Sequence, residues 1–134
     1  MDVCGPYPTN RSGNKYVLVV TEYLTKWVEC WALRDQKAET IARSFEQYVA
    51  RHGVPEAVLT DQGRNFESNL FRHLCAKYGI EKRSTTGYHP QCNGLTERFN
   101  NTMNTMFTNY VNDNQDDWDE WLPSVLLAYR TAEH

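Results

Sequence analysis

The sequence lacks the long apolar runs, paired cysteines and excess of basic residues that would each assign it to a specialised class of protein. None of its apolar runs approaches the roughly 18 residues of a membrane-spanning helix, and no charged-then-apolar leader opens the chain. No repeat, low-complexity tract or linker interrupts the 134 residues. We therefore expect one compact domain with a single hydrophobic core and no membrane partner.

Cysteine usage excludes a disulfide-rich scaffold. The four cysteines are widely scattered and none forms a CxxC pair, which favours reduced thiols in a nuclear or cytosolic setting. His89 and Cys92 are close enough in sequence to be half of a zinc site, but no second pair occurs at ligand spacing. A zinc-binding adaptor is therefore the least supported function.

An excess of basic charge is also lacking. The formal net charge of −3 argues against a generic basic nucleic-acid binder. However, five of the 17 acidic residues lie within residues 113–120, and the rest of the chain is nearly neutral. Net charge therefore leaves a nucleic-acid partner open and does not predict one.

Hydrophobic periodicity predicts an alternation of strands and helices. Apolar or β-branched runs separated by turn residues predict strands over residues 1–5, 15–23, 26–33, 56–60 and 81–86. Apolar positions at helical spacing predict helices over residues 37–52, 66–78, 94–112 and 116–132, the last bent at Pro123. The first three strands should form an antiparallel meander, and helical crossovers should make the later two parallel neighbours. This order predicts an α/β fold with one mixed sheet and helices on both faces.

Three acidic residues occupy positions that suit a metal site. Asp2 lies on the first predicted strand, Asp61 follows the fourth, and Glu97 lies in the first turn of the third predicted helix. The carboxyl ends of strands in an open α/β sheet face the functional crevice. Carboxylates drawn together there would repel one another unless a cation neutralised them, and such oxygen ligands prefer Mg²⁺ or Mn²⁺ to Zn²⁺. These positions are compatible with a metal-dependent phosphodiester enzyme.

Each of these acids alone also has an ordinary structural explanation. An acid in the first turn of a helix is common, and Asp61-Gln62-Gly63 has the composition of a turn. The polar helix face that carries Asn101 and Asn104 could be plain solvated surface. The tryptophans are expected in the core and not as platforms for stacking bases: Trp27, Trp31, Trp118 and Trp121.

Longer stretches of sequence, covering nearly the whole chain, are more specific than the single acids. They are DVCGPYP, GNKYVLVVTEYLTKWVE, GVPEAVLTDQGRNFES, GYHPQCNGLTERFNNTM and DDWDEWLPSVLLAYRT. TDQG-x-x-F is coupled to YHPQ-x-NG-x-x-E-R with 35 residues between Asp61 and Glu97. Together these stretches resemble the catalytic core of retroviral-type integrases, most closely the gypsy-type LTR retrotransposon branch, and the spacing is similar to that family's D,D-35-E triad.

The resemblance implies a fold, a chemistry and a set of residues. The implied fold is RNase H-like, a five-stranded mixed sheet flanked by helices, with residues 1–134 forming one catalytic core domain. Asp2, Asp61 and Glu97 are implied as catalytic residues and as ligands of two Mg²⁺ ions, for which Mn²⁺ can substitute. The implied reactions are cleavage near the 3′ end of the element's DNA and transfer of that end into target DNA. The residues implied in DNA contact are Tyr88, Gln91, Asn93, Asn100, Asn101, Asn104, Lys82 and Arg83.

The resemblance also implies partners and a location. The partners are element and target DNA and a homo-oligomer of at least two subunits, in the nucleus or in the cytoplasm before nuclear import. The chain departs from the family in its short first strand, with only Met1 before Asp2, and in lacking the zinc-binding and carboxy-terminal domains. Two rivals stay open: a simple RNase H-like nuclease, opposed by the HPQ-x-NG-x-x-E stretch, and a domesticated, catalytically silent DNA- or protein-binding module, opposed by the complete triad.

Overall fold

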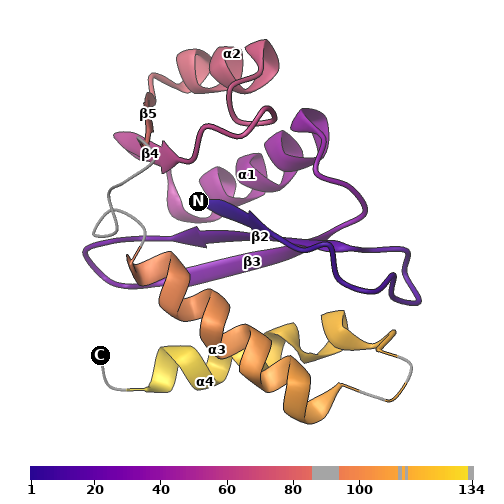
Figure 1. Ribbon diagram of the computed structural model, residues 1–134. Coiled ribbons are helices and arrows are strands. Elements are labelled where there is room, and N and C mark those ends of the chain that lie inside the picture. Colours follow the sequence, from indigo (N-terminus) through magenta and orange to yellow (C-terminus); the bar gives the residue numbers. More distant parts are fainter. Residues whose placement is uncertain (86–93, 112, 114, 133–134) are drawn as a thin grey trace.

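A computed structural model describes residues 1–85, 94–111, 113 and 115–132. Within these ranges the elements are β1 Asp2–Cys4, β2 Tyr16–Thr21, β3 Val28–Leu33, α1 Ala38–His52, β4 Ala57–Thr60, α2 Asn69–Tyr78, β5 Glu81–Ser84, α3 Gly94–Tyr110, a 3-10 turn η1 Trp118–Trp121 and α4 Leu122–Thr131 (Figure 1). The predicted strands and helices are confirmed, with ends that differ by a few residues. No helix in the described part of the chain is long and apolar enough to cross a bilayer.

The strands form two hydrogen-bonded sheets and not the single mixed sheet that the sequence predicted. β1, β2 and β3 form the expected antiparallel meander, in which Asp2 lies opposite Val19. β4 and β5 pair in parallel across the helical connection, as predicted. β1 is three residues long, and the Met1 amino group donates a hydrogen bond of 2.9 Å to the Leu59 carbonyl of β4.

The three-stranded sheet divides the predicted single core in two, because side chains of β2 alternate between its faces. Leu18 and Val20 belong to a first core with α1, α2 and β4. Val17 and Val19 belong to a second core with α3, η1 and α4. Figure 1 shows the two groups of helices on opposite sides of this sheet. Burial on both faces explains why the centre of β2 is a continuous apolar run.

Local residues in the sequence set the two ends of α2 and the start of α4. The Ser68 side chain caps α2 by accepting a hydrogen bond of 3.2 Å from the Phe71 N–H, and Gly79 ends this helix in the left-handed conformation at φ +69°. Pro123 lies in the first turn of α4, where a missing N–H is tolerated. The bend predicted at Pro123 is therefore the junction between η1 and α4.

Candidate active site

Asp61 is positioned by the carboxyl end of β4. Thr60, the last residue of that strand, is fully buried, and its hydroxyl donates a hydrogen bond of 2.9 Å to the backbone carbonyl of Asp61. The Asp61 carboxylate accepts a hydrogen bond of 2.8 Å from the Gly63 N–H, which closes the predicted turn. Asp61 is exposed, so its carboxylate is held by the strand end and remains open to solvent.

Gly63 occupies a crowded position beside this carboxylate. A Cβ atom added at residue 63 would lie 2.8 Å from Asp61 Oδ1 and 2.9 Å from Asn65 Oδ1. Both distances are shorter than real Cβ atoms show, so a side chain there would displace the Asp61 carboxylate. The sequence identified Gly63 only as a turn residue, because its approach to a candidate catalytic group depends on the folded turn.

Asp2 is half-buried on β1 and interacts with α3. Its carboxylate accepts hydrogen bonds from the Val3 N–H at 2.9 Å and from the Asn100 side-chain amide at 3.2 Å. Burial raises the pKa of Asp2 and the charge of Asp61 raises it further, whereas the two hydrogen bonds lower it. Asp2 and Asp61 also line the same cavity, so their negative charges repel each other when both are ionised.

Glu97 is carried by the first turn of α3, which packs on the other side of the sheet. The preceding residue, Thr96, is 2% exposed, and its hydroxyl forms a hydrogen bond of 3.0 Å with the Thr21 hydroxyl at the end of β2. Phe99 and Met103 are fully buried in the second core and fix the following turns on the sheet. Sequence reasoning missed the Thr21–Thr96 pair, since two threonines 75 residues apart give no local signal.

The three acids line one cavity of about 280 Å³. Met1, Thr96 and Asn100 complete its wall. The fold therefore brings together β1, the end of β4 and the start of α3. Within the described residues, no group of three or more histidine, cysteine, aspartate or glutamate side chains is arranged to hold a metal as it stands. Joint ligation by all three acids would require their side chains to rotate.

The chemistry of the cavity wall fits a divalent cation. Its candidate ligands are oxygens, which Mg²⁺ and Mn²⁺ prefer. Asn100 Oδ1 is buried and has no hydrogen-bond partner in the described part of the chain. The amide keeps this orientation because its Nδ2 donates to the Asp2 carboxylate. This unpaired acceptor and the two repelling carboxylates together create a negative potential, which a bound cation would neutralise.

Some residues predicted to contact DNA have intramolecular partners. Asn100 donates to Asp2, and the Asn104 side-chain oxygen accepts a hydrogen bond of 2.8 Å from the Tyr7 hydroxyl. Asn101 and Asn104 are exposed on α3, so both stay accessible to a ligand. The amide of Asn100 instead orients a candidate catalytic residue.

The two predicted basic contacts are engaged in ion pairs. Lys82 is only 11% exposed at its side chain and pairs with Glu67 at 2.9 Å. Arg83 pairs with Glu81, also at 2.9 Å. A phosphate would have to compete with these carboxylates, which weakens the case for both residues as DNA contacts.

The remaining predicted DNA contacts and the zinc candidates lie outside the described residues: Tyr88, Gln91, Asn93, His89 and Cys92. Cys4, Cys30 and Cys75 are free thiols. Burial raises the pKa of Cys4 and of Cys30 to about 12, so both sulfurs are protonated and unreactive at neutral pH.

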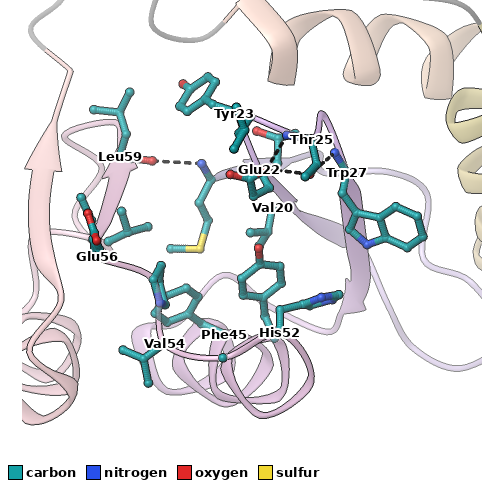
Figure 2. Close-up of a pocket in the computed structure, with 18 residues that line it drawn as sticks. Val20, Glu22, Tyr23, Thr25, Trp27, Phe45, His52, Val54, Glu56 and Leu59 are labelled. Atoms are coloured by element: carbon teal, nitrogen blue, oxygen red, sulfur yellow. Dashed lines mark hydrogen bonds between the residues drawn. The ribbon is translucent and has the colours of Figure 1, made fainter.

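A larger cavity of about 850 Å³ lies between the end of β2 and the start of β4 (Figure 2). Figure 2 shows Val20 and Phe45 at this cavity, together with Glu22 and Glu56. Only Met1 is shared with the acid cavity, and neither Asp2, Asp61 nor Glu97 contributes to its wall. Size alone therefore does not select the candidate site, which is chosen here by the grouping of the three acids.

The chain shares the RNase H-like fold of integrase catalytic cores. It aligns over 99% of its length with the crystal structure of the catalytic core domain of BIV integrase, covering 84% of that chain, with a TM-score of 0.75 and 22% sequence identity. The family model described as "Integrase core domain" matches residues 1–90, which is more than half of the chain. The chain belongs to this family and is a retroviral-type integrase catalytic core.

Two relatives illustrate how much of a longer protein the chain represents. An uncharacterized protein of Caenorhabditis elegans is 36% identical over 88 residues, which are 66% of this chain and 7% of that protein. The retrovirus-related Pol polyprotein from transposon 412 of Drosophila melanogaster is 29% identical over 105 residues, which are 78% of this chain and 8% of the polyprotein. The chain therefore spans less than a tenth of the length of these two relatives.

Proposed function

We propose that this domain is the catalytic core of a DNA polynucleotidyl transferase. It cleaves retroelement DNA near its 3′ end and transfers the freed end into target DNA. The observation that carries the proposal is the cavity lined by Asp2, Asp61 and Glu97, which come from three distant parts of the chain. Membership of the integrase core family supports the same reaction class.

In this proposal Asp2, Asp61 and Glu97 hold two Mg²⁺ ions, with Mn²⁺ able to substitute. Two such ions, when bound, activate an attacking oxygen and stabilise a leaving oxygen in phosphoryl transfer. The chain's own part is to position the three carboxylates. β1 and the end of β4 carry the aspartates, Asn100 orients Asp2 through its amide, and Thr96 fixes the turn that carries Glu97.

The proposal extends to partners and location. The substrates are the ends of the element's DNA and a target DNA, and the active form is a homo-oligomer of at least two subunits in the nucleus. The motif stretches around Asp61 and Glu97 support assignment to the gypsy-type branch. The charge distribution is compatible with a DNA partner, since five of the 17 acidic residues lie within residues 113–120 and the rest of the chain is nearly neutral.

A strand-transfer and disintegration assay on branched DNA, with Mg²⁺ or Mn²⁺, tests the reaction. Wild type should be active and Glu97→Gln should lose at least about 100-fold, since it removes a candidate ligand with little change in shape. Glu46→Gln is the control, because Glu46 is an exposed helix residue away from the cavity. Equal activity of wild type and Glu97→Gln would contradict the catalytic assignment, whereas a wild type without activity would favour the catalytically silent module.

A further inference from the structure

Most of the exposed large hydrophobic side chains gather at the cavity drawn in Figure 2. Within the described residues seven such side chains are exposed, and four of them line this cavity: Tyr23, Leu24, Trp27 and Val54. A cluster of exposed apolar side chains marks an interaction site, whereas scattered ones do not. We call this surface, together with Glu22 and Glu56 in its wall, the apolar groove.

The charge of the apolar groove argues against a polyanionic ligand. Its wall carries the Glu22 and Glu56 carboxylates and, among the described residues, no lysine or arginine. Neither carboxylate forms an ion pair within the described part of the chain. Two other groups in the wall can carry a positive charge, and both are engaged: His52 with a carboxylate of β3 at 3.3 Å, and the Met1 amino group with a carbonyl of β4 at 2.9 Å. The groove therefore suits a partner that combines apolar side chains with a lysine or arginine.

The backbone at the end of β2 is turned toward the groove. The Glu22 N–H donates a hydrogen bond of 2.8 Å to the Trp27 carbonyl across the hairpin to β3. Backbone groups of successive residues point to opposite sides of a strand, so the N–H and C=O of Thr21 point away from β3. β1 pairs with β2 only from Asp2 onward, opposite Val19. The Thr21 backbone groups therefore lie beyond the end of β1, where they are available to a further strand.

The start of β4 presents a second backbone edge to the same groove. The carbonyls of Glu56 and Thr60 accept hydrogen bonds of 2.9 and 2.8 Å from N–H groups at the start of β5 and just after its end. By the same alternation, Ala57 and Leu59 point their backbone groups away from β5. The hydrogen bond from the Met1 amino group to the Leu59 carbonyl agrees with this direction. The backbone groups of Ala57 therefore face the groove beyond Met1.

The groove is one strand wide where it meets β1. There β1 pairs with β2, and the amino group at its start bonds to β4, so a single extended chain spans the space between the two strands. Val20 and Val58 both face the first core. Glu22 and Glu56, each two residues from one of these valines, lie on the same face. A strand inserted in line with β1 would therefore place one of its side chains between the two carboxylates.

We propose that the apolar groove binds an extended segment of a partner protein, which adds as a strand in line with β1 and antiparallel to β2. The segment carries a lysine or arginine that lies between Glu22 and Glu56, and its backbone pairs with Thr21 and Ala57. Strand addition of this kind derives affinity from main-chain hydrogen bonds and specificity from alternate side chains. The bound strand joins the two sheets into one. This binding does not depend on the proposed reaction.

The probe is a capped, fluorescein-labelled pentapeptide of sequence TVTKT. Its valine and lysine are two positions apart and so share one face of an extended strand. Two further peptides differ from it at one position each. TVTET reverses the charge, and TVTKP removes the N–H that pairs with Thr21. Binding to the wild-type protein is measured by fluorescence anisotropy, and hydrogen exchange of the backbone amides is followed by NMR.

TVTKT should bind saturably with a Kd below about 1 mM. Binding should be weaker by at least about tenfold for TVTET and by about threefold for TVTKP, because one loses the ion pairs and the other a main-chain hydrogen bond. In the complex the amides of Thr21 and Ala57 should exchange at least about tenfold more slowly than in the free protein. Equal affinities of the three peptides, unchanged exchange at both amides, or no saturable binding up to about 1 mM would overturn the proposal.

A pair of protein variants tests the two carboxylates. The groove variant carries Glu22→Gln and Glu56→Gln. The control variant carries Glu39→Gln and Glu46→Gln, which removes two exposed acids outside the groove and the same amount of charge. The preference for TVTKT over TVTET should fall to within about twofold in the groove variant and stay at about tenfold in the control variant. The same loss of preference in both variants would mean that net charge governs binding, which would overturn the proposal.

A second copy of the chain is the competing occupant of the apolar groove. Sedimentation of the protein with and without TVTKT separates the two occupants. A dimer that TVTKT dissociates would show that another copy fills the groove and would overturn the proposal, whereas an unchanged sedimentation coefficient supports a partner segment. Thermal unfolding followed by circular dichroism checks that each variant folds. If the groove variant does not fold, the comparison of the three peptides on the wild-type protein decides the outcome.

Discussion

The two hydrophobic cores on either side of β2 position different parts of the candidate site. The first core supports β4, which places Asp61 at a strand end. The second core supports α3, which places Glu97 in a first turn attached to β2. Asp2 lies on the sheet between them and contacts Asn100 of α3. The site forms only where both cores pack on the same strand, β2. Damage to either core therefore displaces one acid from the others.

The largest expected effect is on the free energy of unfolding, when the central aromatic side chain of the second core is removed. Trp118 is 2% exposed and its indole N–H donates a hydrogen bond of 2.7 Å to the Pro8 carbonyl. Trp118→Ala should lower the free energy of unfolding by about 3–5 kcal/mol, because it leaves a cavity and an unpaired carbonyl. Urea denaturation measures the change. Trp27→Ala is the matched control, since Trp27 is 40% exposed and should cost about 1 kcal/mol through its contact with Arg130.

A loss at Trp118→Ala as small as the one expected for Trp27→Ala would show that the second core does not depend on Trp118. In that case the placement of Glu97 by the second core would depend on the packing of α3 alone. A loss confined to Trp118→Ala, accompanied by reduced strand transfer at temperatures where the variant stays folded, would tie the packing of this core to the placement of Glu97.

An intermediate effect, on strand-transfer activity, is expected from a substitution beside Asp61. Gly63→Ala should lower strand-transfer activity about tenfold with little change in stability, because the new methyl group displaces the Asp61 carboxylate. Gly94→Ala near Glu97 is the matched control, since a Cβ there meets nothing within 4 Å. Activity and the thermal midpoint are measured for both variants. If Gly94→Ala is as harmful as Gly63→Ala, the crowding at Asp61 is not the cause.

The smallest expected effect is on stability and comes from the charge of Glu67. Glu67 accepts hydrogen bonds from Lys82, Ser84 and Arg72, and these lower its pKa from 4.5 to about 2. Because the pKa is lower in the folded chain, ionised Glu67 stabilises the fold above pH 4.5, and this contribution is lost as the pH falls toward 2. Solvent screening limits it to about 1 kcal/mol.

Glu67→Gln should therefore lower Tm at neutral pH. The difference from wild type should shrink as the pH is lowered from about 4.5 to about 2, because the wild-type carboxylate also becomes neutral. Thermal unfolding of both proteins over this pH range is the measurement. A difference that stays constant with pH would mean that the Glu67 side chain acts through packing and not through its charge.

Local patterns in the sequence predicted the order of the elements. Apolar periodicity and turn residues located the strands and helices to within a few residues, since both reflect neighbours in sequence. The single mixed sheet was wrong, because it depends on whether β1 forms a ladder with β4, across more than 50 residues. Trp27 was expected in the core and is 40% exposed. It lies at the end of a hairpin, where burial depends on what packs beside it.

The three acids of the candidate site could be predicted from the sequence, but the partners of its polar neighbours could not. Asp2, Asp61 and Glu97 were expected from the resemblance to integrase cores, and the fold places all three around one cavity. The partners of Asn100, Asn104 and Lys82 were not predictable, because amide and ammonium groups bind whatever the fold brings near them.

The hydrogen bond between Thr21 and Thr96 attaches α3 to the sheet beside the candidate carboxylate of Glu97, so a tilt of the helix would pivot near its first turn. At 1.5 Å per residue, Glu97 lies about 1.5 Å along the axis from Thr96, whereas Tyr110 lies about 21 Å away. A tilt that moved the far end of the helix by about 2 Å would shift the start of Glu97 by only about 0.1–0.2 Å. The distal half of α3 can therefore change its sequence or take up a contact without misplacing the third acid.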